Sequence, residues 1–169
     1  MASSERFGYE WDTYADMTAE YENQFRNWIH PLTEADFRGK SLLDAGCGMG
    51  RNSYWPLMLG TKEVTAFDLD PRTVARAKET LKKFSNATII QKSIYEIDWQ
   101  NQFDIAMSIG VIHHLEDPKK ALSNMIRSLK SGGTLLIWVY SHEGNELYVK
   151  IFNPIRKHVT SKLPVSITI

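Results

Sequence analysis

Glycines occupy every second position of the loop 46–50 (Gly-Cys-Gly-Met-Gly), which follows the short apolar run 41–45 (Ser-Leu-Leu-Asp-Ala). Glycine has no Cβ, so the backbone here can turn sharply, adopt positive φ and approach a bound molecule closely. If a helix follows the loop, its unpaired N–H groups face the same molecule. A tight turn without a ligand also uses glycine, so this pattern indicates a binding loop but does not identify the ligand.

Asp68 is the residue that suggests a ligand class. It lies at the end of a second apolar run, and in a parallel sheet that end is adjacent to the glycine loop. A carboxylate there can accept hydrogen bonds from both hydroxyls of a ribose. The alternative is a surface acid that caps the next helix, but Asp70, followed by Pro71, already suits the cap. We therefore expect a nucleoside ligand.

Asp44 bears on which nucleoside is bound. A dinucleotide loop normally reads G-x-G-x-x-G, and the third glycine admits a pyrophosphate. The loop 46–50 is one residue tighter, and Asp44 precedes it. A negative charge at this point repels a pyrophosphate and attracts an ammonium or sulfonium group, so the sequence favours a cationic ligand.

Apolar periodicity predicts the elements that position these residues. The expected fold is an α/β, doubly wound, Rossmann-like parallel sheet with the strand order 3-2-1-4-5. We expect a kink or late start in the helix 51–59 because it contains Pro56, and we expect Gly132-Gly133 to end the last core helix. The predicted strands are 41–45, 62–67, 87–91, 103–108 and 134–140.

The two ends of the chain have different character. Residues 1–15 are rich in aromatic side chains, and Tyr21, Phe25, Trp28 and Ile29 recur at helical spacing. We interpret that stripe as core packing, with a lid over the ligand as the alternative. A helix near 143–152 is expected before a basic tail. The predicted divisions are 1–39 (N-terminal aromatic lead-in and helix, a lid or cap), 40–140 (binding core) and 141–169 (C-terminal helix and tail).

Composition narrows the function class. The 169 residues carry 20 basic and 20 acidic side chains, so bulk charge gives no support for a nucleic-acid partner. The single cysteine, Cys47, makes an internal disulfide impossible, and neither a secretory signal nor a transmembrane segment is evident. We expect a cytoplasmic protein.

Four motifs taken together resemble the class I S-adenosylmethionine-dependent methyltransferases, most closely the small-molecule branch called methyltransferase 11, 12 and 25. The resemblance covers about residues 40–140, and the motifs are 43–50, 66–70, 103–108 and 129–133. It implies S-adenosyl-L-methionine as cofactor, with S-adenosyl-L-homocysteine as product. Methyl transfer is an in-line displacement that depends mainly on positioning.

The resemblance also implies roles for individual residues. The loop Gly46, Cys47, Gly48 and Gly50 surrounds the methionine part, with Asp44 near its amino group. Asp68 holds the ribose, Leu69 packs on the adenine, Ser93 and Ile94 border the adenine edge, and Ser108, Ile109 and Gly110 approach the sulfonium. Many relatives carry an acid at the position of Ser93 in this chain, so we expect adenine selection here to depend on backbone groups instead.

Three groups outside the cofactor loop are further candidates. His113 and His114 are bases near the predicted cleft that titrate close to neutral pH; they are candidate general bases, although a structural role is the alternative. A metal site is not expected, because no third or fourth ligand accompanies the pair. Tyr14 and Tyr21 are candidate lid residues over the cofactor or substrate, with packing as the alternative.

Members of this family usually have seven strands, the last two forming a hairpin. Only 29 residues follow Tyr140, so we expect a sheet without that hairpin, a truncated form or fragment, and an exposed strand edge that permits self-association. A sixth strand formed by residues 163–169 would contradict this.

The function expected is methyl transfer to an O, N or C atom of a small-molecule acceptor. A cofactor-binding but inactive partner or fragment is the main alternative. A nicotinamide-dependent oxidoreductase is opposed by the tight loop and Asp44, and membrane association through the basic segment 148–162 is a further alternative. No motif identifies the acceptor.

Overall fold

A computed structural model describes residues 17–140 of the chain. The aromatic lead-in with Tyr14, the predicted helix near 143–152, the basic segment 148–162 and the end 163–169 lie outside the described residues. Expectations about those segments, and about the three divisions of the chain, therefore remain predictions.

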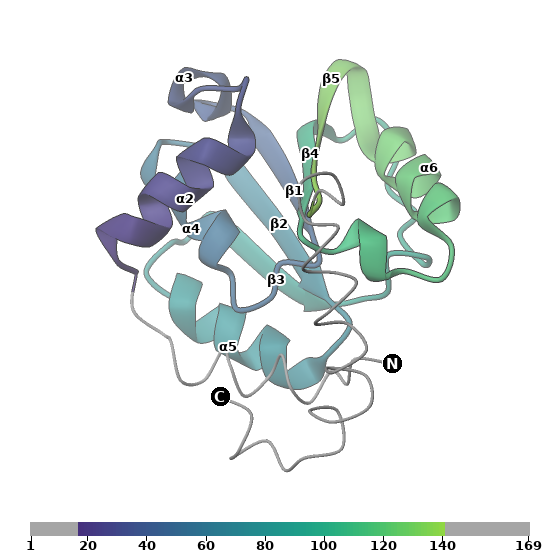
Figure 1. Ribbon diagram of the computed structural model, residues 1–169, viewed down its shortest axis with the longest axis horizontal. Helices are drawn as coiled ribbons and strands as arrows, with labels where there is room; N and C mark the ends of the chain where they lie inside the picture. Colours follow the sequence, from purple (N-terminus) through teal and green to yellow (C-terminus); the bar gives the residue numbers. More distant parts are fainter. Residues whose placement is uncertain (1–16, 141–169) are drawn as a thin grey trace, which may run out of the picture.

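Five parallel strands form one sheet in the order β3-β2-β1-β4-β5, which confirms the predicted topology (Figure 1). The central strand β1 pairs with β2 on one side and with β4 on the other. The strands are β1 (Ser41–Ala45), β2 (Glu63–Asp68), β3 (Ala87–Gln91), β4 (Phe103–Ile109) and β5 (Leu129–Trp138).

Helices cover both faces of this sheet (Figure 1). The helices are α2 (Ala19–Ile29), α3 (Glu34–Phe37), α4 (Arg51–Met58), α5 (Pro71–Leu81) and α6 (Pro118–Ser128), with a short 3₁₀ helix η1 (Ile112–His114). Asp70 caps α5 by accepting a hydrogen bond from the Arg72 N–H at 2.9 Å, as the sequence predicted. Asp117 caps α6 in the same way, through the Lys120 N–H.

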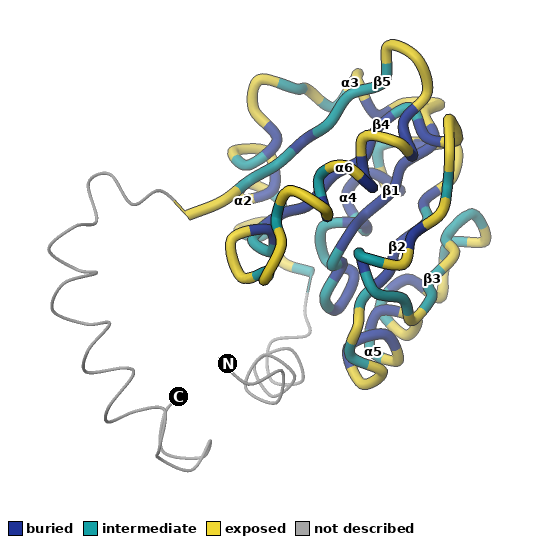
Figure 2. Tube along the Cα trace, turned by 90° about the vertical axis from the view of Figure 1, so that its right-hand side faces the viewer, coloured by how far each residue is buried: buried dark blue, intermediate teal, exposed yellow. Residues whose placement is uncertain are grey.

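The core lies in two layers because successive strand residues point to opposite faces. Leu42 of β1 packs in one layer with Phe25 and Ile29 of α2, whereas Leu43 packs in the other with Met125 of α6. All five residues of β1 are buried (Figure 2). The aromatic stripe of α2 is therefore core packing at Phe25 and Ile29, as interpreted from the sequence.

Helix α4 begins at Arg51, directly after Gly50, and includes Pro56, so of the two expectations for this helix the late start is not observed. One expected boundary is wrong. Helix α6 ends at Ser128 and not at Gly132-Gly133, because both glycines lie within β5, where the pairing with β4 is irregular between Phe103 and Ile105. A Cβ on Gly133 would lie 2.9 Å from the Lys130 carbonyl oxygen, so this irregularity requires glycine.

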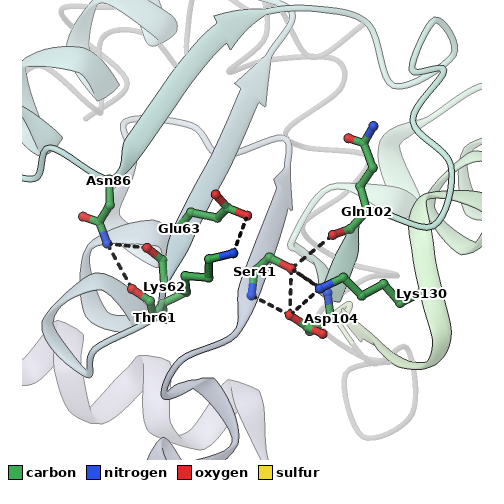
Figure 3. A network of polar contacts seen from close by, with 8 residues as sticks. All are labelled: Ser41, Thr61, Lys62, Glu63, Asn86, Gln102, Asp104 and Lys130. Carbon is green, nitrogen blue, oxygen red and sulfur yellow. Dashed lines mark hydrogen bonds and ion pairs between the residues drawn. The ribbon is translucent and has the colours of Figure 1, made fainter.

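The amino ends of the strands are joined by a polar network (Figure 3). Asp104 of β4 accepts hydrogen bonds from the Ser41 N–H (2.8 Å), the Ser41 hydroxyl (2.7 Å) and the Lys130 ammonium (3.0 Å). These residues lie at the first or second position of three neighbouring strands, β1, β4 and β5. The Ser41 backbone N–H and the Lys130 charge hold the pKa of Asp104 far below its usual range.

We expect Asp104→Asn to lower the free energy of unfolding at pH 7 by about 1–3 kcal/mol, the range for hydrogen bonds to a charged group. Because the folded pKa is depressed, this stabilisation is present above the unfolded value near pH 4 and is lost as the pH falls towards the folded value. Urea unfolding at pH 7 and pH 3 tests this.

The matched control is Asp98→Asn. Asp98 also pairs with one lysine, Lys92, but its side chain is 83% exposed, so its loss should change stability by less than about 0.5 kcal/mol. Equal effects of the two substitutions would contradict the role assigned to the Asp104 network.

Candidate functional site

The glycine loop at the carboxyl end of β1 is held by the end of β2. The Phe67 carbonyl accepts hydrogen bonds from the N–H groups of Gly46 and Cys47, both at 2.9 Å. One Asp68 carboxylate oxygen accepts from the Gly48 N–H at 3.0 Å. The loop therefore turns around the last two residues of β2, and its position depends on them.

The backbone of this loop requires glycine. Gly46, Gly48 and Gly50 have φ values of 79°, 54° and 85°, in the left-handed region. A Cβ at Gly46 would lie 2.7 Å from the Val111 side chain, which follows β4. The loop after β4 is thus packed directly against the glycine loop.

Asp44 is the most unusual group at this end of the sheet. Its side chain is 1% exposed, and the Ser53 hydroxyl of α4 donates a hydrogen bond to it at 2.6 Å. Burial raises the pKa of Asp44 to about 7; the Ser53 hydrogen bond opposes this shift, and the nearby charge of Asp68 adds to it. A cationic ligand group close to Asp44 would relieve this cost of burial.

Asp68 has a structural task that sequence reasoning missed. Besides the bond from Gly48, its other carboxylate oxygen accepts from the Asp70 N–H at 3.1 Å. Each oxygen has further acceptor capacity, and the residue is half-buried. Asp68 is thus placed both to order the loop and to accept from a ligand. The motif spacing alone could not show the first role, because the N–H donors belong to the backbone.

The other residues predicted to contact the cofactor lie at or near the same carboxyl ends of the strands. Leu69 is 68% exposed, whereas Ile94 and Ile109 are buried. Ser93 is half-buried, and its hydroxyl accepts from the Tyr95 N–H. Ser108 is fully buried and donates to the Ala45 carbonyl at 2.9 Å, so its side chain ties β4 to β1. A Cβ on Gly110 would meet nothing within 4 Å.

Cys47 is buried, and burial raises the pKa of its thiol well above the usual value. The nearby carboxyl groups of Asp44 and Asp68 add to that shift. The thiol is therefore un-ionised at neutral pH and unreactive as a nucleophile. Its buried side chain belongs to the apolar core layer that contains Leu42.

The two histidines lie in η1, after β4. His113 and His114 are exposed, and their ring centroids are 3.9 Å apart. Partial burial, with a contribution from His114, lowers the pKa of His113, so this imidazole is neutral and able to accept a proton at pH 7. Within residues 17–140, no group of three or more His, Cys, Asp or Glu is arranged to hold a metal ion.

Tyr21 reaches the loop from α2. Its ring lies 4.1 Å from the guanidinium carbon of Arg51, the first residue of α4 after Gly50. Partial burial lowers the pKa of Arg51, and Tyr21 and Tyr140 oppose that shift. The structure thus places Tyr21 against Arg51 at one end of the glycine loop, a contact that the sequence analysis did not foresee for Arg51.

Asp44 generates a prediction about stability. In the protein without ligand, a raised carboxyl pKa stabilises the fold fully below the unfolded value near 4, and this stabilisation is lost as the pH rises through about 7. At about 1.4 kcal/mol per pKa unit, the free energy of unfolding should fall by about 3–5 kcal/mol across that window. Chemical denaturation between pH 4 and 8 measures this fall.

Asp44→Asn should flatten the pH dependence, because the amide does not ionise. Ser53→Ala removes the hydrogen bond that opposes the shift, so it should move the fall to higher pH. The idea would be wrong if wild type and Asp44→Asn showed parallel curves over this range.

Comparison with known proteins places the site in context. The methyltransferase domain family matches residues 43–137. Among curated relatives, the chain is 34% identical to an uncharacterized protein of Synechococcus sp., across 69% of this chain and 31% of the relative. It is 30% identical to a tRNA U34 carboxymethyltransferase of Campylobacter hominis, across 66% of this chain and 40% of that enzyme. The chain therefore spans less than half the length of these relatives.

Solved structures show the same architecture. A proposed S-adenosylmethionine-dependent methyltransferase from Listeria monocytogenes superposes with a TM-score of 0.58 at 25% identity, covering 71% of this chain and 55% of that one. A protein from Pyrococcus horikoshii gives a TM-score of 0.69 at 24% identity, covering 82% and 67% of the two chains. The second likeness concerns the fold alone.

Proposed function

Because the chain belongs to the methyltransferase domain family, we propose that residues 40–140 bind S-adenosyl-L-methionine at the glycine loop and transfer its methyl group to a small-molecule acceptor. The observation that carries this proposal is the pairing of a glycine loop in left-handed conformation with two carboxyl groups, buried Asp44 and half-buried Asp68.

The residues present fit this cofactor. The glycine loop gives close backbone approach, and the cationic amino group of the ligand would compensate the buried Asp44 carboxylate. Asp68 retains acceptor capacity for a ribose, and the exposed Leu69 next to it gives an apolar surface for adenine. When bound, the sulfonium supplies an activated methyl group. In this proposal the side chains of the chain align the reactants and hold charges.

The acceptor side would be formed by the segment after β4. Gly110 keeps its backbone uncovered there, and His113 follows in η1. A neutral His113 can take a proton from an acceptor hydroxyl or amine as the new bond to carbon forms. This role is required only for acceptors that must lose a proton.

Asp68→Ala should strongly weaken cofactor binding. Isothermal titration of the wild-type protein should detect S-adenosyl-L-methionine and S-adenosyl-L-homocysteine at micromolar concentrations and no NADH, because Asp44 and the short loop disfavour a pyrophosphate. Loss of both Asp68 hydrogen bonds to the backbone and of the ribose acceptor should lower the affinity by at least about a hundredfold, or about 3 kcal/mol.

Asp70→Ala is the matched control. It removes an aspartate two positions away that caps α5, which should cost about 1 kcal/mol of stability and leave affinity within about twofold. NADH binding by the wild type, or equal affinities of Asp68→Ala and the wild type, would refute the proposed site.

A second candidate acceptor is tRNA, which several relatives act on according to their names. The equal numbers of acidic and basic residues give it no electrostatic support. The main alternative function remains a domain that binds cofactor without turnover.

An assay of radiolabelled methyl transfer distinguishes a small-molecule acceptor, a tRNA acceptor and a domain without turnover. The chain should label a small-molecule fraction of a cell extract, and His113→Gln should lower that rate by about 10²–10⁴-fold with unchanged cofactor affinity, if a base is used. Label in nuclease-sensitive tRNA would support the second candidate. Cofactor binding with no label in either fraction would support the inactive alternative.

A further inference from the structure

Aromatic rings from three separate segments form a continuous chain beside the glycine loop. Trp28 of α2 contacts Trp138 of β5, with ring centroids 4.6 Å apart. Trp138 contacts Tyr140 at 4.7 Å, and Tyr140 contacts His113 of η1 at 5.4 Å. The last two contacts are edge-on, at interplanar angles of 73° and 83°, the arrangement that aromatic pairs favour.

This ring group (Trp28, Trp138, Tyr140, His113) lies at the carboxyl end of β4 and β5, on the side of the proposed methyl acceptor. Two observations connect it to the glycine loop. Val111, two residues before His113, contacts the loop at Gly46. Tyr140 is also close enough to Arg51, which follows Gly50, to influence its pKa.

Two members of the ring group are exposed to solvent, and the other two pack against the core. Tyr140 is 66% exposed and His113 is exposed, whereas Trp28 and Trp138 are partly buried against the core. Exposed rings beside a binding loop provide π faces at small conformational cost, because their neighbours hold them in place. The exposure of Tyr140 leaves ring surface available to a flat ligand.

Resting on the proposed function, we propose that the ring group is the acceptor platform and that the acceptor carries a planar aromatic or heteroaromatic ring. Tyr140 stacks on that ring, and His113 lies at its edge. Trp138 and Trp28 brace Tyr140 from behind. This assigns a substrate class to a site for which no sequence motif specified one.

The chemistry of the step is balanced by the acceptor itself. A heteroatom on the ring attacks the methyl carbon, the carbon–sulfur bond breaks, and its electron pair stays on sulfur to give the thioether. The acceptor proton passes to His113 or to solvent. No further reactant is needed.

The test compares 2-naphthol with its saturated counterpart 2-decalol, which keeps the hydroxyl and the bicyclic skeleton but lacks the flat π system. Binding of each is measured by calorimetry to the whole chain saturated with S-adenosyl-L-homocysteine. We expect 2-naphthol to bind at least about fivefold more tightly, since an aromatic pair contributes about 0.5–1.5 kcal/mol beyond area burial.

Tyr140→Leu should reduce 2-naphthol affinity about three- to tenfold and leave 2-decalol within about twofold, whereas Tyr140→Phe should behave as the wild type. The control Tyr54→Leu removes a ring that packs on Trp55 and Phe84 elsewhere, and it should not change the ratio. Equal binding of the two probes, binding of neither, or an unchanged ratio in Tyr140→Leu would overturn the platform.

This outcome is distinguishable from failure of the proposed function. Saturation with S-adenosyl-L-homocysteine is measured first, and if the wild type does not bind it, the proposed function fails and the platform fails with it. If the nucleoside binds and the probes are not discriminated, only the platform fails. Melting temperatures of the Tyr140 variants within a few degrees of wild type show that loss of binding is local.

Discussion

The hydrogen bonds between the end of β2 and the glycine loop are the constraint on which the rest of the site depends. The Phe67 carbonyl and the Asp68 carboxylate together take three backbone N–H groups of the loop. These bonds fix the loop in a left-handed path that only glycine follows cheaply. The loop ends at Gly50, which is the N-cap residue of α4, so these bonds also fix the position at which α4 begins. Without them the N–H groups of Gly46, Cys47 and Gly48 would need other hydrogen-bond partners.

Carboxyl groups at the two ends of the strands have different hydrogen-bond environments. At the amino ends, the Asp104 carboxylate accepts hydrogen bonds from Ser41 and from the Lys130 ammonium (Figure 3). At the carboxyl ends, Asp44 has one hydroxyl partner for a buried carboxyl group. Within residues 17–140, the buried carboxyl group of Asp44, with its raised pKa, thus lies at the carboxyl ends of the strands. This contrast is the pattern expected when a local rule is broken at a functional site.

Packing joins parts of the chain that are remote in sequence. Val111 fills the space that a Cβ on Gly46 would need, so the segment after β4 and the glycine loop restrict each other. On the same side, α2 carries Trp28 to Trp138 and Tyr21 to Arg51. Helix α2 thus belongs to the core through Phe25 and Ile29, and through Tyr21 and Trp28 it also contacts α4 and β5. Within residues 17–140, no helix is long and apolar enough to cross a membrane.

The sequence by itself determined the sheet order, the helix caps and the two carboxyl groups, Asp44 and Asp68, that lie beside the glycine loop. These features depend on local periodicity, on short-range capping chemistry and on the handedness of parallel crossovers, which residue types encode directly. It failed at the end of α6, because Gly132 and Gly133 belong to a strand whose pairing with β4 is irregular. The late start that was one expectation for α4 is absent, because Pro56 is accommodated inside the helix.

The tertiary structure alone decided the environment of each candidate residue. Asp44 is fully buried, Asp68 orders the loop, and the Ser108 hydroxyl donates a hydrogen bond to the Ala45 carbonyl. Each of these features depends on contacts between segments more than eight residues apart. The ring group likewise joins α2, β5 and η1. Such features depend on which side chains the sheet brings together, and motif spacing does not carry that information because burial and partners are set by distant residues.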